Sequence, residues 1–93
     1  MYVSLAIHYP KPDKEALLIE AMKQLGKAVQ NQPGLYYMNA HKDLQKGVVV
    51  GLSIWETKEA MLAAGPIIMG VVQNTPFDDW ETQPREIYQL DVV

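Results

Sequence analysis

The sequence contains no cysteine, so disulfide bonds and thiolate metal sites are both excluded. It also lacks any long apolar run, and its first residues, MYVSLAIHY, read as a strand rather than as a basic segment followed by an apolar one. A signal peptide and a transmembrane helix are therefore not expected, which favours a cytoplasmic protein with no membrane partner. Basic residues are few, and eight Lys and Arg against eleven Asp and Glu give a net charge of −3. Nucleic acid is not an expected partner, because it calls for a basic face.

Histidine is also scarce. His8 and His41 are the only two, and they are the only side chains that ordinarily titrate near neutral pH. No His-x-x-x-His motif or carboxylate cluster accompanies them, and a third strand is expected to separate the two strands that carry them, so we predict no metal site. The acidic residues gather late in the chain, where Arg85 is the only basic residue among them. We interpret them as a solvated edge: Asp78, Asp79, Glu81, Glu86 and Asp91.

The 93 residues form one expected domain, residues 1–93, and 48% of them are hydrophobic. A chain this short is often helped by oligomerisation, and the hydrophobic content is high for a small monomer without cysteine. We expect part of the apolar surface to lie in a subunit interface. A well-filled core is the competing explanation.

The segment Gly47 to Ala64, GVVVGLSIWETKEAMLAA, organises the rest of the chain. It opens as a strand in which aliphatic residues alternate with Val49, Gly51, Ser53 and Trp55. A helix follows without a loop, with Thr57 as its expected N-cap. The small residues Gly51 and Ser53 leave room for a cavity, and Trp55 is expected to offer a large flat surface at its rim.

The other predicted elements flank this segment. A strand at Met1 to Tyr9 precedes a helix from Asp13 to about Asn31, and a second strand covers Leu35 to His41. The helix from about Lys58 is interrupted at Gly65-Pro66, and an irregular arm at 74–84 carries Phe77 and Trp80 before a last strand at 85–93. The two aromatics are expected to cover the cavity mouth of their own subunit or to contact a neighbouring one.

The predicted order is strand, helix, strand, strand, helix, strand, the βαββαβ pattern of a ferredoxin-like α+β domain with an antiparallel four-stranded sheet. Both helices cover the same side of the sheet and leave the other side bare. Burying that bare side against a second copy gives a closed two-fold homodimer.

The register of the central hairpin decides which side chains share a face. A five-residue loop from Asp43 to Gly47 would place His41 opposite Val49, Asn39 opposite Gly51 and Tyr37 opposite Ser53. A four-residue loop would shift the register and move one set to the other face. The first register places six candidate site residues on one side of the sheet: His41, Asn39, Tyr37, Gly51, Ser53 and Trp55. We assume that His8 lies on the same side.

PGLYYMNAHKD followed by VVVGLSIWETKEAMLAA resembles the antibiotic-biosynthesis-monooxygenase-like (ABM) domain of the dimeric α+β barrel superfamily. The matching features are the Pro33-Gly34 entry, the aromatic-bearing second strand, and the hydrophobic strand that ends in Trp55-Glu56 before a helix rich in Glu and Ala. The resemblance implies a homodimeric barrel and a family that includes cofactor-independent oxygenases of phenols and quinols, haem-degrading enzymes, and members with no known activity.

The resemblance favours a monooxygenase that needs no cofactor and acts on a small aromatic phenol or quinol. We expect His41, Asn39 and His8 to be catalytic, with histidine accepting a phenolic proton and the amide stabilising the oxyanion. Trp55, Tyr37, Ser53 and Gly51 are the expected substrate-binding residues. The alternative is a non-catalytic binding or structural dimer, in which both histidines are ordinary strand-end residues and Trp55 belongs to the core.

Haem degradation is disfavoured. The haem-degrading members of this family use an asparagine on the first strand, a tryptophan at the end of the third strand and an axial histidine on the second helix. Trp55 matches the tryptophan, but the segment LAAGPIIMG contains no histidine and the first strand contains no asparagine.

Overall fold

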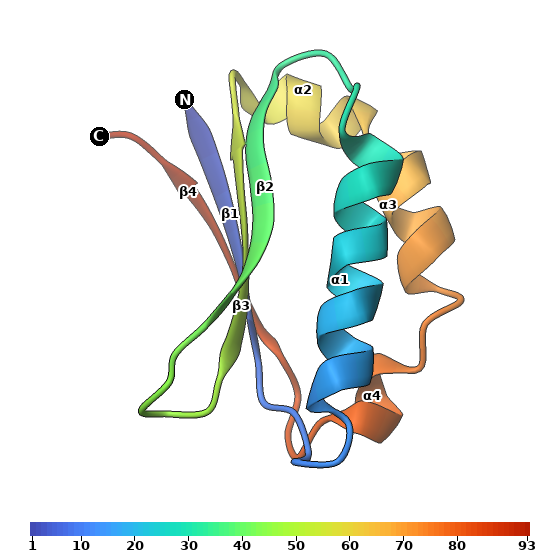
Figure 1. Ribbon diagram of the computed structural model, residues 1–93. Helices are drawn as coiled ribbons and strands as arrows, with labels where there is room; N and C mark the ends of the chain where they lie inside the picture. Colours follow the sequence, from blue (N-terminus) through green and yellow to red (C-terminus); the bar gives the residue numbers. More distant parts are fainter.

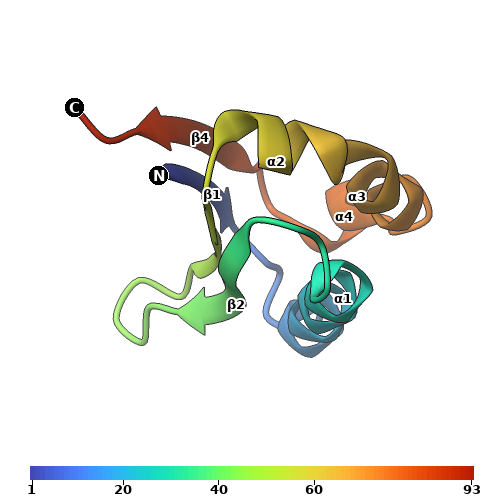
Figure 2. The same cartoon turned by 90° about the horizontal axis from the view of Figure 1, so that it is seen from above.

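The computed structural model describes residues 1–93 and contains one four-stranded sheet with helices on one side (Figures 1 and 2). The strands are β1 (Tyr2–His8), β2 (Leu35–Lys42), β3 (Val49–Trp55) and β4 (Glu86–Asp91). The helices are α1 (Glu15–Val29), α2 (Lys58–Ala63), α3 (Gly65–Val72) and α4 (Phe77–Trp80). None of them is long and apolar enough to cross a membrane.

The strand order is β2-β3-β1-β4, and every neighbouring pair is antiparallel. This arrangement confirms the predicted ferredoxin-like βαββαβ fold. Residues directly opposite each other across the ladder share a face. The face that carries the helices, the covered face, holds Tyr2, Ser4, Ala6, His8, Met38, Ala40, Val49, Gly51, Ser53 and Trp55.

The helix α1 packs on the covered face through the predicted apolar stripe. Leu18, Met22 and Val29 are buried at spacings of four and seven residues, as one helix face requires. Leu18 and Met22 form one core cluster with Val49 of β3 and Phe77 of α4. A second cluster at the other end of the sheet joins Tyr2, Trp55 and Ala64.

The segment after β3 also follows its local sequence signals. The Thr57 side chain caps α2 by accepting the backbone N–H of Ala60 at 3.1 Å, as predicted. The predicted interruption at Gly65-Pro66 is confirmed, because α2 ends at Ala63 and a separate helix, α3, begins at Gly65 with Pro66 in its first turn.

The arm at 74–84 is less irregular than predicted, since residues 77–80 form the short helix α4. Phe77 is buried against α1 and β3 of its own subunit. The end of α4 and the residues after it pair with the chain beyond β1, where Lys11 N donates to Trp80 O and Thr82 N donates to Tyr9 O, both at 2.8 Å. This pairing buries Glu81 between the two segments, so the interpretation of Glu81 as part of a solvated edge is wrong.

The predicted hairpin register is wrong by one residue. His41 lies opposite Val50, Asn39 opposite Leu52 and Tyr37 opposite Ile54. The turn is the four-residue alternative, Leu44 to Gly47. Asp43 closes it by donating its N–H to Val48 O, while its side chain accepts the N–H groups of Gln45 and Lys46. Gly47 supplies the positive φ of 69° that ends the turn.

The face without helices, the open face, is mainly apolar. Its apolar side chains come from the central strands β1 and β3 and from the edge strand β4. The other edge strand, β2, adds Tyr37, Asn39 and His41. Tyr88 and Leu90 of β4 are 45% and 44% exposed. The apolar members of the open face are Val3, Leu5, Ile7, Val50, Leu52, Ile54, Tyr88 and Leu90.

Candidate functional site

A cavity of about 300 Å³ lies between the covered face and the helices. Small side chains from the two central strands form its floor, as predicted for Gly51 and Ser53, and Ser4 and Ala6 of β1 extend it. The apolar residues that line it on the helices are Met22, Leu25, Met61, Ile68, Met69, Val72 and Phe77. The register explains the space, because Ala6 lies opposite Gly51 and Ser4 lies opposite Ser53.

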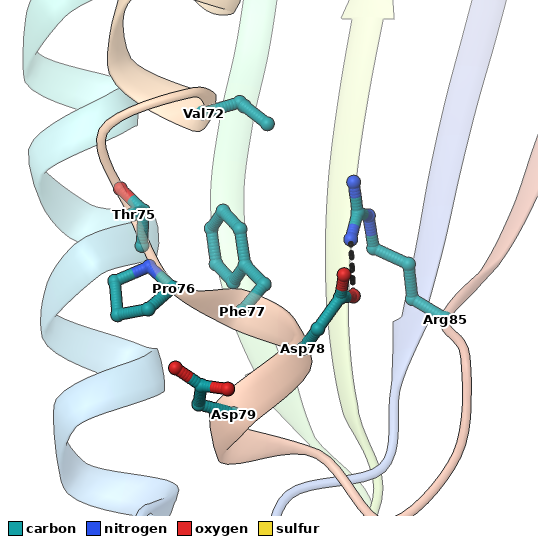
Figure 3. A pocket seen from close by; sticks show the side chains of 7 residues that line it. All are labelled: Val72, Thr75, Pro76, Phe77, Asp78, Asp79 and Arg85. Atoms are coloured by element: carbon teal, nitrogen blue, oxygen red, sulfur yellow. Dashed lines mark ion pairs between the residues drawn. The ribbon is translucent and has the colours of Figure 1, made fainter.

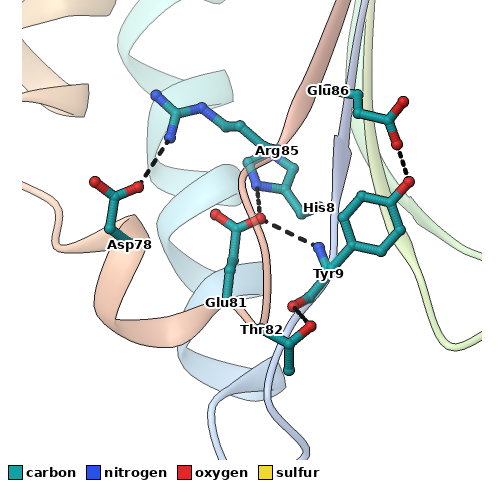
Figure 4. A network of polar contacts seen from close by, with 7 residues as sticks. All are labelled: His8, Tyr9, Asp78, Glu81, Thr82, Arg85 and Glu86. Atoms are coloured by element: carbon teal, nitrogen blue, oxygen red, sulfur yellow. Dashed lines mark hydrogen bonds and ion pairs between the residues drawn. The ribbon is translucent and has the colours of Figure 1, made fainter.

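His8 lines this cavity at the end of β1 and is 4% exposed. Its Nδ1 lies 3.2 Å from Glu81 Oε1, and the same carboxylate oxygen accepts the backbone N–H of Tyr9 at 3.2 Å (Figure 4). Glu81 is itself buried, and its Oε2 has no hydrogen-bond partner. The carboxylate therefore fixes the orientation of the His8 ring from behind the cavity wall.

The surroundings of His8 favour its neutral form. Burial lowers the pKa of His8 below its ordinary value of 6.5, and the charge and hydrogen bond of Glu81 oppose part of that shift. A neutral imidazole held by a carboxylate at Nδ1 carries its proton on Nδ1, so Nε2 retains its lone pair. Nε2 has no protein partner, which leaves it available to accept a proton from a bound molecule.

Phe77 and Arg85 complete this end of the cavity. The Phe77 ring lies 5.5 Å from the His8 ring, and the Arg85 guanidinium lies 5.4 Å from the centre of the Phe77 ring. Both residues also line a second hollow of about 320 Å³, which is formed by the end of α3, the loop before α4, α4 itself and Arg85 (Figure 3). Asp78 and Asp79 make that hollow acidic, and it is a poorer site for an aromatic molecule because most of its lining is polar.

Three predicted site residues lie on the other side of the sheet. Tyr37, Asn39 and His41 project from the open face, because the four-residue turn moved them there, so the predicted common face with His8, Gly51 and Ser53 is wrong. Tyr37 Oη lies 2.6 Å from His41 Nε2, and both side chains are exposed. Of the three, Asn39 is the only one that also borders the cavity, which it does from β2.

Trp55 is part of the core rather than of the cavity rim. It is fully buried between Tyr2 and Ala64, and it does not line the cavity. Its indole N–H donates to Ser53 Oγ at 3.0 Å, which orients the hydroxyl at the cavity floor. The expectation of an exposed stacking surface is therefore wrong, whereas Ser53 and Gly51 lie where the sequence placed them.

Sequence reasoning missed Glu81 and Arg85. Glu81 lies 73 positions from His8 in the sequence, and no local pattern indicates their contact. Arg85 carried one usable signal, since it is the only arginine in the chain. No group of three or more His, Cys, Asp or Glu side chains is placed to hold a metal ion.

The sequence model of the antibiotic biosynthesis monooxygenase family matches residues 1–64. The chain belongs to the ABM family. A search of curated proteins finds no match.

Solved structures share the ABM fold at low sequence identity. Rv0793 from Mycobacterium tuberculosis aligns with a TM-score of 0.84 at 15% identity, covering 99% of this chain and 94% of its own. A structure described as an antibiotic biosynthesis monooxygenase gives 0.79 at 17% identity, covering 100% and 99%. A conserved protein from Methanosarcina mazei Go1 gives 0.83 at 13% identity, covering 96% and 89%. At these identities the likeness establishes the fold.

Proposed function

We propose that this ABM-family chain is a cofactor-independent monooxygenase that oxidises a small phenol or quinol in the cavity between the covered face and the helices. One observation carries the proposal. A buried, neutral histidine, held by a buried carboxylate, presents a free Nε2 to a mainly apolar cavity. Such a pairing suits removal of a phenolic proton where water is largely excluded.

The chemistry requires dioxygen and no other co-reactant. His8 Nε2 takes the ring hydroxyl proton, and the resulting phenolate passes one electron to O₂, giving superoxide and a phenoxyl radical. The two combine at a ring carbon that carries hydrogen, forming a C–O bond and, after protonation, a hydroperoxide. The O–O bond then breaks with loss of that C–H proton, so one oxygen atom stays on the ring as a carbonyl and the other leaves as water. The substrate supplies all four electrons.

The residues around the cavity have separate parts in this proposal. Met22, Met61 and Phe77 enclose the ring and limit access of water. Ser53, whose oxygen already accepts the Trp55 indole N–H, retains its own O–H for the substrate. Glu81 stabilises the imidazolium that forms on His8 when the proton is taken. His41 and Tyr37 do not line this cavity, because their side chains leave the sheet on its open face, and Asn39 borders it only from β2.

We also propose that the open face is covered by a second copy of the chain. The face is a contiguous apolar surface over three strands, and a two-fold interface would bury the same residues on both copies. A single subunit gives that face no cover, since all four helices lie on the other side (Figure 2). Sedimentation at micromolar concentration should give twice the 10.5 kDa mass of the chain, and a monomer mass would refute the dimer.

Oxygen uptake tests the enzymatic proposal. Chelator-treated protein is supplied with a panel of hydroquinones and phenols, and oxygen consumption is followed together with product formation after subtraction of the protein-free rate. The expected result is a catalytic rate with one O₂ consumed for each oxygenated product. Thermal stabilisation by the same compounds without any oxygen uptake would instead support the second candidate, a non-catalytic binding protein, which the enclosed cavity also favours.

A further inference from the structure

Arg85 is the only residue with a permanent charge among those that line the cavity. Apart from His8, the other lining residues are apolar, small or polar without charge. A single fixed cation in a neutral, partly desolvated wall attracts one negative charge more strongly than it would in water. Arg85 is therefore the lining residue suited to bind an anionic group.

The register of β1 and β4 brings this cation beside the candidate base. The β1–β4 ladder ends at Ile7 and Glu86, so His8 and Arg85 are the next residues along the two segments, and both line the cavity. Figure 4 shows the two side chains entering from these neighbouring segments. Both also flank the same Phe77 ring at nearly equal distances, 5.4 Å for the guanidinium and 5.5 Å for the imidazole. Both groups therefore border the same end of the cavity.

The guanidinium retains its capacity to bind an anion. Its only charged partner is Asp78, at 3.8 Å, and that side chain is 95% exposed (Figures 3 and 4). A solvent-exposed ion pair of this length contributes at most about 1 kcal/mol. The contact with the Phe77 ring holds the guanidinium without using its hydrogen-bond donors. The planar fork of donors is therefore free for a carboxylate, which it can bind through two parallel hydrogen bonds.

The carboxylates near Arg85 lie outside the cavity lining. Glu81 does not line it, and its Oε1 is engaged by His8 and by the Tyr9 N–H. Asp78 and Asp79 line the outer hollow and are exposed, so solvent and salt screen their repulsion of an anion.

We propose that the ligand of this cavity is an aromatic acid, a phenol or quinol that also carries a carboxylate, with the carboxylate on Arg85 and a ring hydroxyl directed to His8 Nε2. The volume of about 300 Å³ is at the lower end for ligand sites, which limits the ligand to a small ring system. The identity of the aromatic hydroxyl part rests on the proposed function, whereas the carboxylate contact rests on Arg85 alone.

Calorimetric titration tests the proposal without requiring turnover. The probes are para-hydroxybenzoate and para-hydroxybenzamide, which have nearly the same shape and differ in charge. The proteins are the full chain, Arg85→Gln, Arg85→Lys and the control Lys23→Gln, which removes one cation from an exposed position on α1. A charge-assisted bidentate contact predicts at least tenfold tighter binding of the acid than of the amide in the full chain.

Four results support the proposal together. The preference for the acid disappears in Arg85→Gln, is reduced in Arg85→Lys, and is retained in Lys23→Gln, while the affinity for the amide changes by less than about threefold, a difference well under 1.4 kcal/mol. Equal affinity for acid and amide in the full chain, failure of the acid to bind, or a preference that persists in Arg85→Gln would overturn it. If Arg85→Gln does not fold, the same decision rests on Arg85→Lys.

The outcomes separate this proposal from the proposed function. Oxygen uptake with neutral quinols together with no preference for acids would leave the oxygenase and remove the carboxylate site. An Arg85-dependent preference for the acid without any oxygen uptake would leave the carboxylate site and remove the oxygenase.

Discussion

The two faces of the sheet carry one histidine each, and only one of the two borders a cavity. On the covered face, His8 is 4% exposed, bonded to a buried carboxylate, and borders a cavity. On the open face, His41 is exposed, and its Nε2 is engaged by the Tyr37 hydroxyl. Both stand at strand ends and look alike in the sequence. The difference shows that a histidine becomes a candidate base through what packs around it and which of its nitrogens remains free.

Replacing each of the two histidines separately gives the largest expected difference in activity between variants of the two faces. His8→Ala and His8→Gln should each lower the rate of oxygen uptake by about a hundredfold or more, because the general base is lost. The matched change His41→Ala should leave the rate within about twofold, since its side chain does not reach the cavity. Circular dichroism confirms that each variant is folded. A large loss in His41→Ala with an active His8→Gln would reverse the assignment.

Placing a charge on the open face tests what that face is for. Leu5 lies in the middle of β1 on the open face, and Leu5→Lys should weaken the dimer by about a hundredfold, because two unpaired lysines would be buried at the two-fold interface. Leu17→Lys on α1 is the control, since Leu17 is already 49% exposed and lies on the helix layer. Sedimentation equilibrium measures both. A dimer of unchanged affinity in Leu5→Lys would show that another surface forms the interface.

The partner of His8 should produce a smaller and pH-dependent effect. His8 accepts a proton only when neutral, so activity falls as the pH falls through its pKa in the folded protein. Burial lowers that pKa below 6.5 and Glu81 raises it in part, so the unmodified chain should remain active below pH 6.5. In Glu81→Gln the pKa of His8 should fall further. The acid limb of the pH–rate profile then moves to lower pH, while the plateau rate drops by about tenfold because the imidazolium loses its carboxylate.

A matched variant separates this effect from a general loss of charge. Glu86→Gln removes a carboxylate from the exposed side of β4, where it bonds to the Tyr9 hydroxyl. Its pH–rate profile should follow that of the unmodified chain. A shift of the acid limb to higher pH in Glu81→Gln would mean that Glu81 does not support the protonated form of His8.

The cavity floor was predictable from the sequence because it depends on local composition. Gly51 and Ser53 alternate with aliphatic residues, so both lie on one side of β3 whatever the register in which the adjacent strands pair with it. The position of Tyr37, Asn39 and His41 depended on one residue in a turn. The side chain of Asp43 satisfied two amides and selected the shorter loop, which moved all three to the open face.

By itself the sequence determined the order of the elements, the apolar stripe of α1, the break at Gly65-Pro66 and the family, because periodicity, caps and proline act over a few residues. Only the tertiary structure decided which histidine is buried, that Glu81 is its partner and that Arg85 borders the same cavity. These contacts join segments that lie more than seventy positions apart, and pairing across a sheet leaves no periodic trace in either segment.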